Sequence, residues 1–198
     1  MTIDTIIYIG IVIYSIILHE IAHGYAALLC GDQTAKRAGR LTLNPGPHLD
    51  PIGSVALPIS AVLMGFGVFG WAKPVPIDPS YLTTKIKDIF VSVAGVATNL
   101  FLCFLFLMLI KFNVFSFYNE LFVKVAIVNL GLGIFNLLPF PPFDGLHILR
   151  AIFPKLKSFA SRFEYNPAAM IVSILIAGYV FSLFFPTVVN FVFGLVLV

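Results

Sequence analysis

The sequence predicts an all-α, polytopic membrane protein in which about four to six membrane segments form one domain, residues 1–198. Three observations predict this fold class. First, 60% of the residues are hydrophobic and 11% are charged, whereas soluble domains carry roughly 25% charged residues. Second, four stretches are apolar over about the 20 residues that a helix needs to cross a bilayer. Third, the basic residues gather in two loops, as cytoplasmic loops do.

The first apolar stretch, residues 5–30, is predicted to be a retained membrane helix. It lacks the basic n-region and the small-residue cleavage pattern of a signal peptide. No proline or glycine occurs between Ile11 and His23, so this part is expected to be helical.

Another apolar stretch, residues 52–71, is interrupted by Pro58, Gly65, Gly67 and Gly70. Ten of the twelve basic residues lie in residues 31–88 and 150–164. A full crossing at 52–71 would place basic loops on opposite sides of the membrane, against the positive-inside rule. We therefore expect residues 40–71 to form a re-entrant, partly β-like element. Such backbone is allowed at membrane depth only where protein or a water-filled cavity covers it.

Three later stretches complete the predicted membrane segments. Residues 89–110 and 121–138 are long enough and apolar enough to cross. The last stretch, residues 168–185, is followed by Pro186. Because proline interrupts a helix, we expect this helix to kink or stop near Phe185.

The stretch His19-Glu20-Ile21-Ala22-His23 places three ionisable groups inside the first apolar segment. Such groups are rare within membranes and usually functional. Residues i and i+4 lie on one face of a helix, so His19 and His23 could bind one metal ion. Glu20 could then act as a general base on an activated water, which is the chemistry of an H-E-x-x-H motif. The alternative is a chance pattern, with both histidines satisfied by hydrogen bonds in a helix core.

Asp144 is the best candidate for the third protein ligand that a catalytic zinc ion needs. Pro139, Pro141 and Pro142 precede it and cannot continue a helix. Asp144 is therefore expected on a non-helical loop, with Gly145 allowing a tight turn. It lies at the same depth as the two histidines, and an ionised carboxylate at that depth needs a cation.

Two residues near Asp144 have open roles. Asn136 could hold unwound substrate backbone or stabilise a developing oxyanion, or it could cap the broken helix. His147 could bond to Asp144 and support the metal site, or it could be a simple boundary histidine.

Other classes of site are disfavoured. Cys30 and Cys103 are predicted to be reduced membrane thiols, not a disulfide or a metal site. No cluster of Lys and Arg alternates with aromatic residues, so no nucleic-acid partner is expected.

Two separated motifs resemble the site-2 protease family of intramembrane zinc metalloproteases, peptidase family M50. They are His19-Glu20-x-x-His23 and Asn136-x-x-Pro139-x-Pro141-x-x-Asp144-Gly145. Between them, "AGVATNL" (94–100) is similar to the family's A-G-P-x-x-N segment, with Val96 where the family usually has proline. "LTLNPGPHLDPIGSVALP" (41–58) and "GWAKPVPIDP" (70–79) resemble stretches of a compact prokaryotic subgroup.

The resemblance implies a site-2-protease-like core of three membrane segments, 5–30, 89–110 and 121–145, beside a β-like element. The domain core would cover about residues 5–150, and no PDZ or nucleotide-sensing domain would fit in 198 residues. The family's motifs imply one Zn²⁺ per chain and a role for each matching residue: metal ligands His19, His23 and Asp144, general base Glu20, substrate-binding Asn136, and structural or substrate-contacting Asn99.

The resemblance also implies the activity of a zinc metalloendopeptidase in regulated intramembrane proteolysis. Its partners would be the lipid bilayer and transmembrane protein or peptide substrates, cut within or near their membrane segments. The expected location is the cell membrane, as a multi-pass protein with its active site toward the cytoplasm. The alternatives are a membrane zinc transporter, an inactive protease-like scaffold, and an H-E-x-x-H protease of the prenyl-protein type.

Overall fold

The computed structural model describes residues 3–50, 72–156 and 166–197. Four helices are long: α1 (Ile3–Leu29), α4 (Lys85–Lys111), α5 (Asn119–Asn136) and α8 (Pro167–Leu197). Two are short: α2 (Thr34–Arg37) and α6 (Asp144–Ile152). Single 3₁₀ turns are η1 (Gly46–His48), η3 (Pro79–Tyr81), η4 (Ser116–Tyr118) and η5 (Pro154–Leu156). No strand occurs among these described residues.

The four long helices are each apolar and long enough to cross a membrane. The spans are Ile6–Leu29, Lys85–Lys111, Ser116–Asn136 and Ala168–Leu197. The predicted all-α, multi-pass membrane protein is therefore confirmed. The sequence predicted a kink or a stop near Phe185, and of these two alternatives the stop is wrong.

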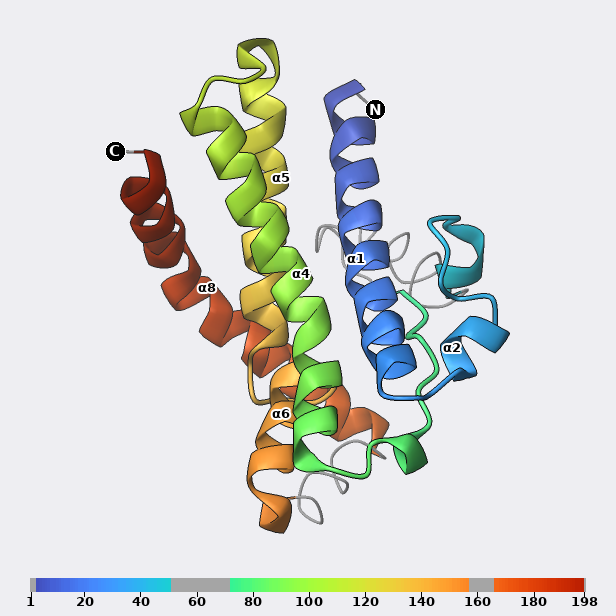
Figure 1. The fold of residues 1–198 in the computed structure, drawn as a ribbon. Helices are drawn as coiled ribbons and strands as arrows, with labels where there is room; N and C mark the ends of the chain where they lie inside the picture. The colour runs from blue at the N-terminus through green and yellow to red at the C-terminus, as the bar shows by residue number, and fades with distance from the viewer. Residues whose placement is uncertain (1–2, 51–71, 157–165, 198) are drawn as a thin grey trace.

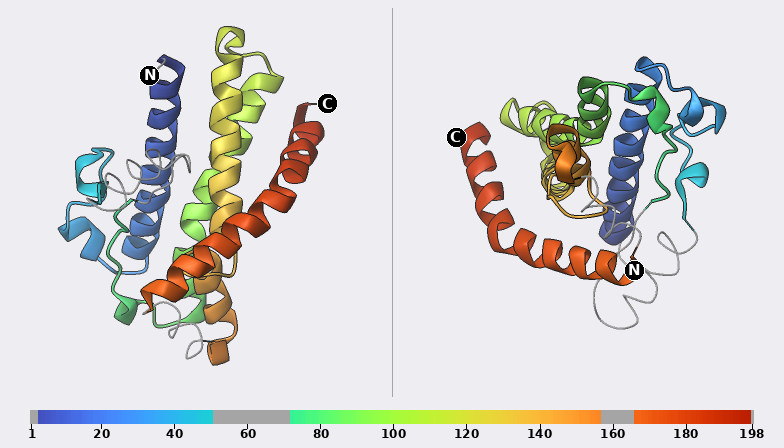
Figure 2. Two further views of the ribbon diagram at one scale, coloured as in Figure 1. Left: turned by 180° about the vertical axis from the view of Figure 1, so that it is seen from behind. Right: turned by 90° about the horizontal axis from the view of Figure 1, so that it is seen from below.

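Instead, α8 continues through Pro186 to Leu197, and its ribbon curves along its length (Figure 2). Proline removes one backbone hydrogen bond, but a membrane helix tolerates this where the remaining backbone groups are satisfied. An unbroken apolar sequence then keeps the helix favourable in lipid.

Helix α4 is the centre of the bundle. It runs beside α1 and α5, while α8 crosses obliquely and α6 lies near the start of α4 (Figure 1). Buried residues from α4 and α5 form one core cluster, against which α8 packs: Cys103, Leu107, Ala126 and Leu130. A second cluster joins Ala26 and Ala27 of α1 to Val91 of α4. Small residues at these positions let helices approach closely, as in other membrane bundles.

The re-entrant element expected at residues 40–71 is mostly outside the described residues, since these exclude 51–71. Residues 40–50 are described and form turns and η1, without a strand. His48 O accepts a hydrogen bond from the Lys73 N–H at 2.9 Å, which joins the chain on either side of residues 51–71. The residues that follow, 72–78, have no regular secondary structure and contact α1. A re-entrant element at 51–71 stays a prediction.

The proline-rich run after α5 does unwind, but Asp144 is not on a loop as predicted. Asp144 is the first residue of α6, and Phe143 before it is extended. A carboxylate in the first turn is favoured by the helix dipole. Gly145 serves close packing instead of a tight turn, because a Cβ there would lie 2.1 Å from the Leu137 carbonyl oxygen. The glycine thus lets the start of α6 sit directly against the end of α5.

Candidate metal centre

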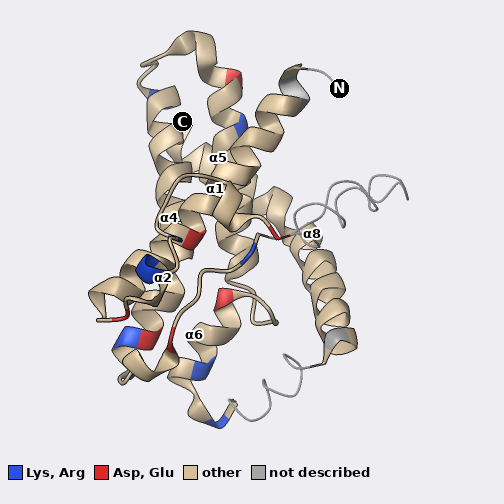
Figure 3. Cartoon of the chain, turned by 90° about the vertical axis from the view of Figure 1, so that its right-hand side faces the viewer, with Lys and Arg blue, Asp and Glu red and all other residues tan. Residues whose placement is uncertain are grey.

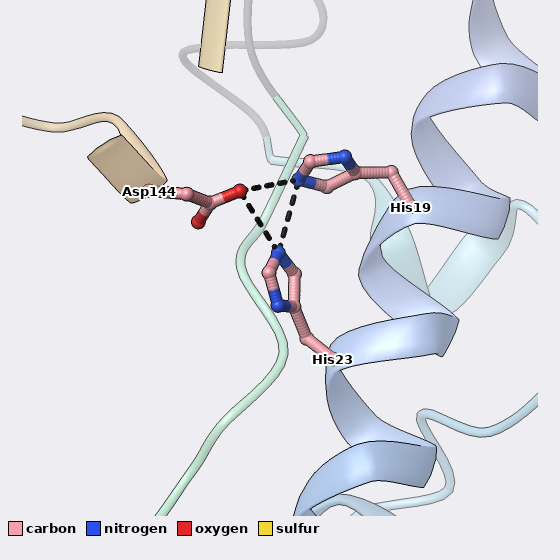
Figure 4. A group of neighbouring side chains, drawn as sticks. All are labelled: His19, His23 and Asp144. Atoms are coloured by element: carbon pink, nitrogen blue, oxygen red, sulfur yellow. Dashed lines mark hydrogen bonds and ion pairs between the residues drawn. The ribbon is translucent and has the colours of Figure 1, made fainter. Parts of the chain in front are cut away.

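Three side chains from two helices converge inside the bundle. His19 and His23 project from one face of α1, and Asp144 faces them from the first turn of α6 (Figure 4). Asp144 Oδ2 lies 3.2 Å from the Nε2 atom of each histidine. The two Nε2 atoms lie 3.0 Å apart. All three side chains are largely buried, at 8%, 9% and 15% exposure.

The other nitrogen of each histidine is committed to an acceptor. His19 Nδ1 lies 2.6 Å from Asn99 Oδ1, and His23 Nδ1 lies 2.7 Å from the Val91 carbonyl oxygen. A carbonyl oxygen can only accept, so each Nδ1 carries the hydrogen. In the neutral rings, both Nε2 atoms therefore point lone pairs at each other and at a carboxylate oxygen. That arrangement is repulsive unless a cation lies among them.

The spacing of these atoms fits a zinc ion. Tetrahedral zinc with ligand distances of about 2.0 to 2.1 Å has ligand–ligand distances of roughly 3.3 Å, close to the observed 3.0 and 3.2 Å. Asp144 Oδ2 is also buried without a hydrogen-bond partner. Two imidazoles and one carboxylate are the donor set of a catalytic zinc site, which keeps a fourth position open.

Gly95 of α4 leaves the space between the ligands open. A Cβ at this position would lie 2.4 Å from His23 Nε2 and 2.6 Å from His19 Nε2. Any other residue would therefore press on the two nitrogens that face the centre. The residues present thus fit a zinc ion.

Glu20 lies beside this centre, where it lines a cavity of about 530 Å³ together with His23 and Asp144. Its Oε2 accepts a hydrogen bond of 2.7 Å from the Val75 N–H. The extended segment 72–78 therefore holds the Glu20 carboxylate in place. An acidic group in a cavity next to the metal ligands is positioned for proton transfer.

His147 lines the same cavity, and its Nδ1 lies 3.3 Å from an Arg150 guanidinium nitrogen. Asn136 is the last residue of α5 and donates to the Leu132 carbonyl oxygen of its own helix at 2.9 Å. That bond is the kind expected for a residue at a helix end. Contact with a substrate stays a prediction for Asn136, as does support of the metal site for His147.

Asn99, for which the sequence left two roles open, is fully buried in the helix core. It contacts His19 and does not line the cavity; contact with a substrate stays a prediction for Asn99. Sequence reasoning missed three residues that act around His19, namely Gly95, Asn129 and Ser15. A polar residue inside an apolar segment was the available signal for Asn129 and Ser15. Nothing in a single sequence showed which partners they would meet.

A buried two-histidine, one-carboxylate cluster among membrane-length helices defines a multi-pass membrane protein with a candidate metal centre. The model of "Peptidase family M50" matches residues 113–180. A protein of Bacillus subtilis (strain 168), named "Putative zinc metalloprotease YwhC", is 39% identical over 153 residues, which cover 72% of this chain and 67% of that protein. This chain therefore belongs to peptidase family M50.

Two mycobacterial proteins are similar as well, and both are named "Putative zinc metalloprotease Rip2". The one from Mycolicibacterium smegmatis is 32% identical over 158 residues, covering 73% of this chain and 59% of that protein. The one from Mycobacterium tuberculosis (Erdman) is 33% identical over 135 residues, covering 66% and 51%. The chain thus spans between half and two thirds of the length of these relatives. No solved structure gives a significant match.

Proposed function

We propose that this chain is a zinc metalloprotease that cuts peptide bonds within or near transmembrane segments of other membrane proteins. The observation that carries the proposal is the convergence of His19, His23 and Asp144, with both Nδ1 atoms already bonded, inside a bundle of membrane-length helices. Membership of a peptidase family and the names of the relatives support the same activity.

His19, His23 and Asp144 would hold the ion, and Glu20 would move the proton. A zinc ion held there supplies Lewis-acid chemistry, since it polarises a carbonyl group and lowers the pKa of water. Because Glu20 Oε2 is bonded to the Val75 N–H, we assign proton transfer to Oε1. Glu20 would take a proton from the attacking water and deliver it to the leaving amine.

The substrate would be a membrane-spanning segment that unwinds locally, because a helix hides its amide bonds. Asn136, at the point where α5 ends, would bind the unwound backbone. The concentration of basic residues in two loops favours a cell-membrane orientation with the site toward the cytoplasm.

The proposal is tested in lipid vesicles that contain the protein and a tagged single-pass substrate. Cleavage should stop when phenanthroline removes the metal and should return when zinc is added back. The cut should map within or beside the substrate's membrane segment by mass spectrometry. Zinc uptake by the vesicles without any cleavage would instead support the transporter alternative, and neither uptake nor cleavage would support the inactive scaffold.

A further inference from the structure

A line of buried hydrogen bonds runs from His19 through two asparagines back to α1. Asn99 Oδ1 accepts from His19 Nδ1 at 2.6 Å, and Asn99 Nδ2 donates to Asn129 Oδ1 at 2.9 Å. Asn129 Nδ2 then donates to Ser15 Oγ at 3.0 Å. Both asparagines are 0% exposed and Ser15 is 4% exposed. The line therefore crosses α1, α4 and α5 without reaching the cavity.

The orientation of the Asn129 amide is fixed by its own helix. Asn129 Nδ2 also donates to the Val125 carbonyl oxygen at 2.9 Å. That carbonyl can only accept, so the Asn129 Oδ1 must face Asn99. A flipped Asn129 would bring two oxygens together at Val125 and two NH₂ groups together at Asn99.

The orientation of the Asn99 amide follows from that of Asn129. Asn99 Nδ2 lies between Asn129 Oδ1 and the Ser15 carbonyl oxygen, at 2.9 and 3.4 Å. Both are acceptors, so Asn99 presents its own oxygen to His19. His19 must then carry its hydrogen on Nδ1, which leaves the Nε2 lone pair free for a metal ion.

His23 needs no such support. Its Nδ1 bonds to the backbone carbonyl oxygen of Val91, which is part of α4 and cannot rotate. The acceptor for His19 is a side-chain amide, which presents a donor instead of an acceptor when it turns by half a rotation. Of the two histidines, it is therefore His19 that depends on a second residue to hold its acceptor in place.

We infer that Asn129 is a positioning residue for the metal centre, which acts through Asn99 to fix the His19 tautomer whose Nε2 can bind zinc. This inference rests on the proposed zinc site. Asn129 touches neither the ligands' metal-facing atoms nor the cavity, so its effect should appear in metal affinity before any effect on substrate.

The first test is Asn129→Leu, measured by zinc competition with a chromophoric chelator in detergent. Removing a residue that supports a metal-binding histidine through hydrogen bonds typically lowers metal affinity 10- to 100-fold. We therefore expect about a tenfold loss of zinc affinity. Asn129→Asp should bind zinc nearly as tightly as wild type does. A protonated carboxyl group can still accept a hydrogen bond from Asn99 and can donate one hydrogen bond of its own. Thr98→Val is the matched control, since that hydroxyl bonds to Ala94 O of its own helix at 3.0 Å.

A second variant separates positioning from a general loss of fold. Asn99→Asp presents an oxygen to His19 in either rotation, so Asn129 is no longer needed. The double variant Asn99→Asp/Asn129→Leu should therefore recover most of the zinc affinity that Asn129→Leu loses. The visible spectrum of the Co²⁺-loaded protein should follow the same pattern, with a changed ligand field in Asn129→Leu alone.

Thermal unfolding of the metal-free variants completes the comparison. The inference is overturned if Asn129→Leu binds zinc as tightly as wild type, or if its loss of affinity is not recovered by Asn99→Asp. A wild-type protein that binds no zinc would overturn the proposed function as well. A wild-type protein that binds zinc and cleaves, with an unaffected Asn129→Leu, would overturn only the role of Asn129.

Discussion

The candidate metal centre depends on the orientation of individual histidine nitrogen atoms. His19 and His23 could sit at i and i+4 on any helix and still form an ordinary buried pair. Here each Nδ1 is bonded to an acceptor, and both Nε2 atoms face Asp144. These contacts, more than the five-residue pattern itself, distinguish a metal centre from two satisfied core histidines.

Gly95 provides a direct test of this geometry. We expect Gly95→Ala to lose most of its zinc binding, because the new Cβ would lie within 2.6 Å of both Nε2 atoms. The stability of the metal-free protein should not fall by a comparable amount, since alanine is favoured over glycine in a helix by about 1 kcal/mol. Zinc titration and thermal unfolding measure the two effects. Gly178→Ala is the control, as a Cβ there meets nothing within 4 Å; equal zinc affinity in both variants would contradict the geometry.

Asp32 is a second buried carboxylate, and its hydrogen bonds hold the surrounding backbone. Burial alone would raise its pKa, but hydrogen bonds from Thr34 and from the Asp78 N–H hold the pKa below its ordinary value. The stabilisation is therefore present above about pH 4 and is lost as the pH falls through the depressed pKa. We expect Asp32→Ala to cost about 2 kcal/mol at pH 7.

That cost should shrink as the pH falls below about 4 and through the depressed pKa of Asp32, because the wild-type carboxylate then loses its charge. Thermal unfolding of both proteins across this pH range checks the sign. A difference that grows on acidification would show that Asp32 does not act as a bound carboxylate.

Among the larger elements, segment 72–78 links the loop region to α1. Its Val75 N–H holds Glu20 Oε2 at 2.7 Å. We expect Val75→Pro, which removes this donor, to lower cleavage by about tenfold or more while zinc affinity stays unchanged. Val75→Ala keeps the N–H and should cleave normally. The two variants are compared by cleavage rate at matched zinc content, and equal rates would rule out this role for the segment.

The helices could be predicted from sequence more fully than the contacts between them. Apolar length alone indicates α1, α4 and α5, because lipid requires every backbone group to be satisfied within the helix. The same reasoning wrongly allowed the last helix to stop near Phe185, since proline is a weaker break in lipid than in water. Asp144 could be chosen as a candidate ligand, but not placed as the first residue of α6. That position depends on Gly145 packing against Leu137.

The hydrogen bonds that connect His19 to Asn129 could not be predicted from the sequence for a similar reason. They join residues 80 and 30 positions apart along the chain. Each bond depends on the rotation and register of three helices. Periodicity within one helix carries no information about that register.

The molecule as a whole separates charge from apolar surface. Charged residues lie mainly toward the end of the bundle that carries α2 and α6 (Figure 3). The centre of His19, His23 and Asp144 belongs to the same half, where α6 begins. Large apolar side chains remain exposed on the long helices, including Phe101 and Leu183 at 62% and 64%. This distribution suits a bilayer around the bundle.

The most direct measurement is zinc content and cleavage rate determined together on three proteins. We predict that wild type binds one zinc ion and cleaves, that Glu20→Gln binds zinc but does not cleave, and that Asp144→Ala loses both. The reason is that Asp144 supplies a ligand, whereas Glu20 only moves a proton. A zinc-loaded Glu20→Gln protein with full activity, or an Asp144→Ala protein that binds zinc as wild type does, would contradict the assignment of these roles.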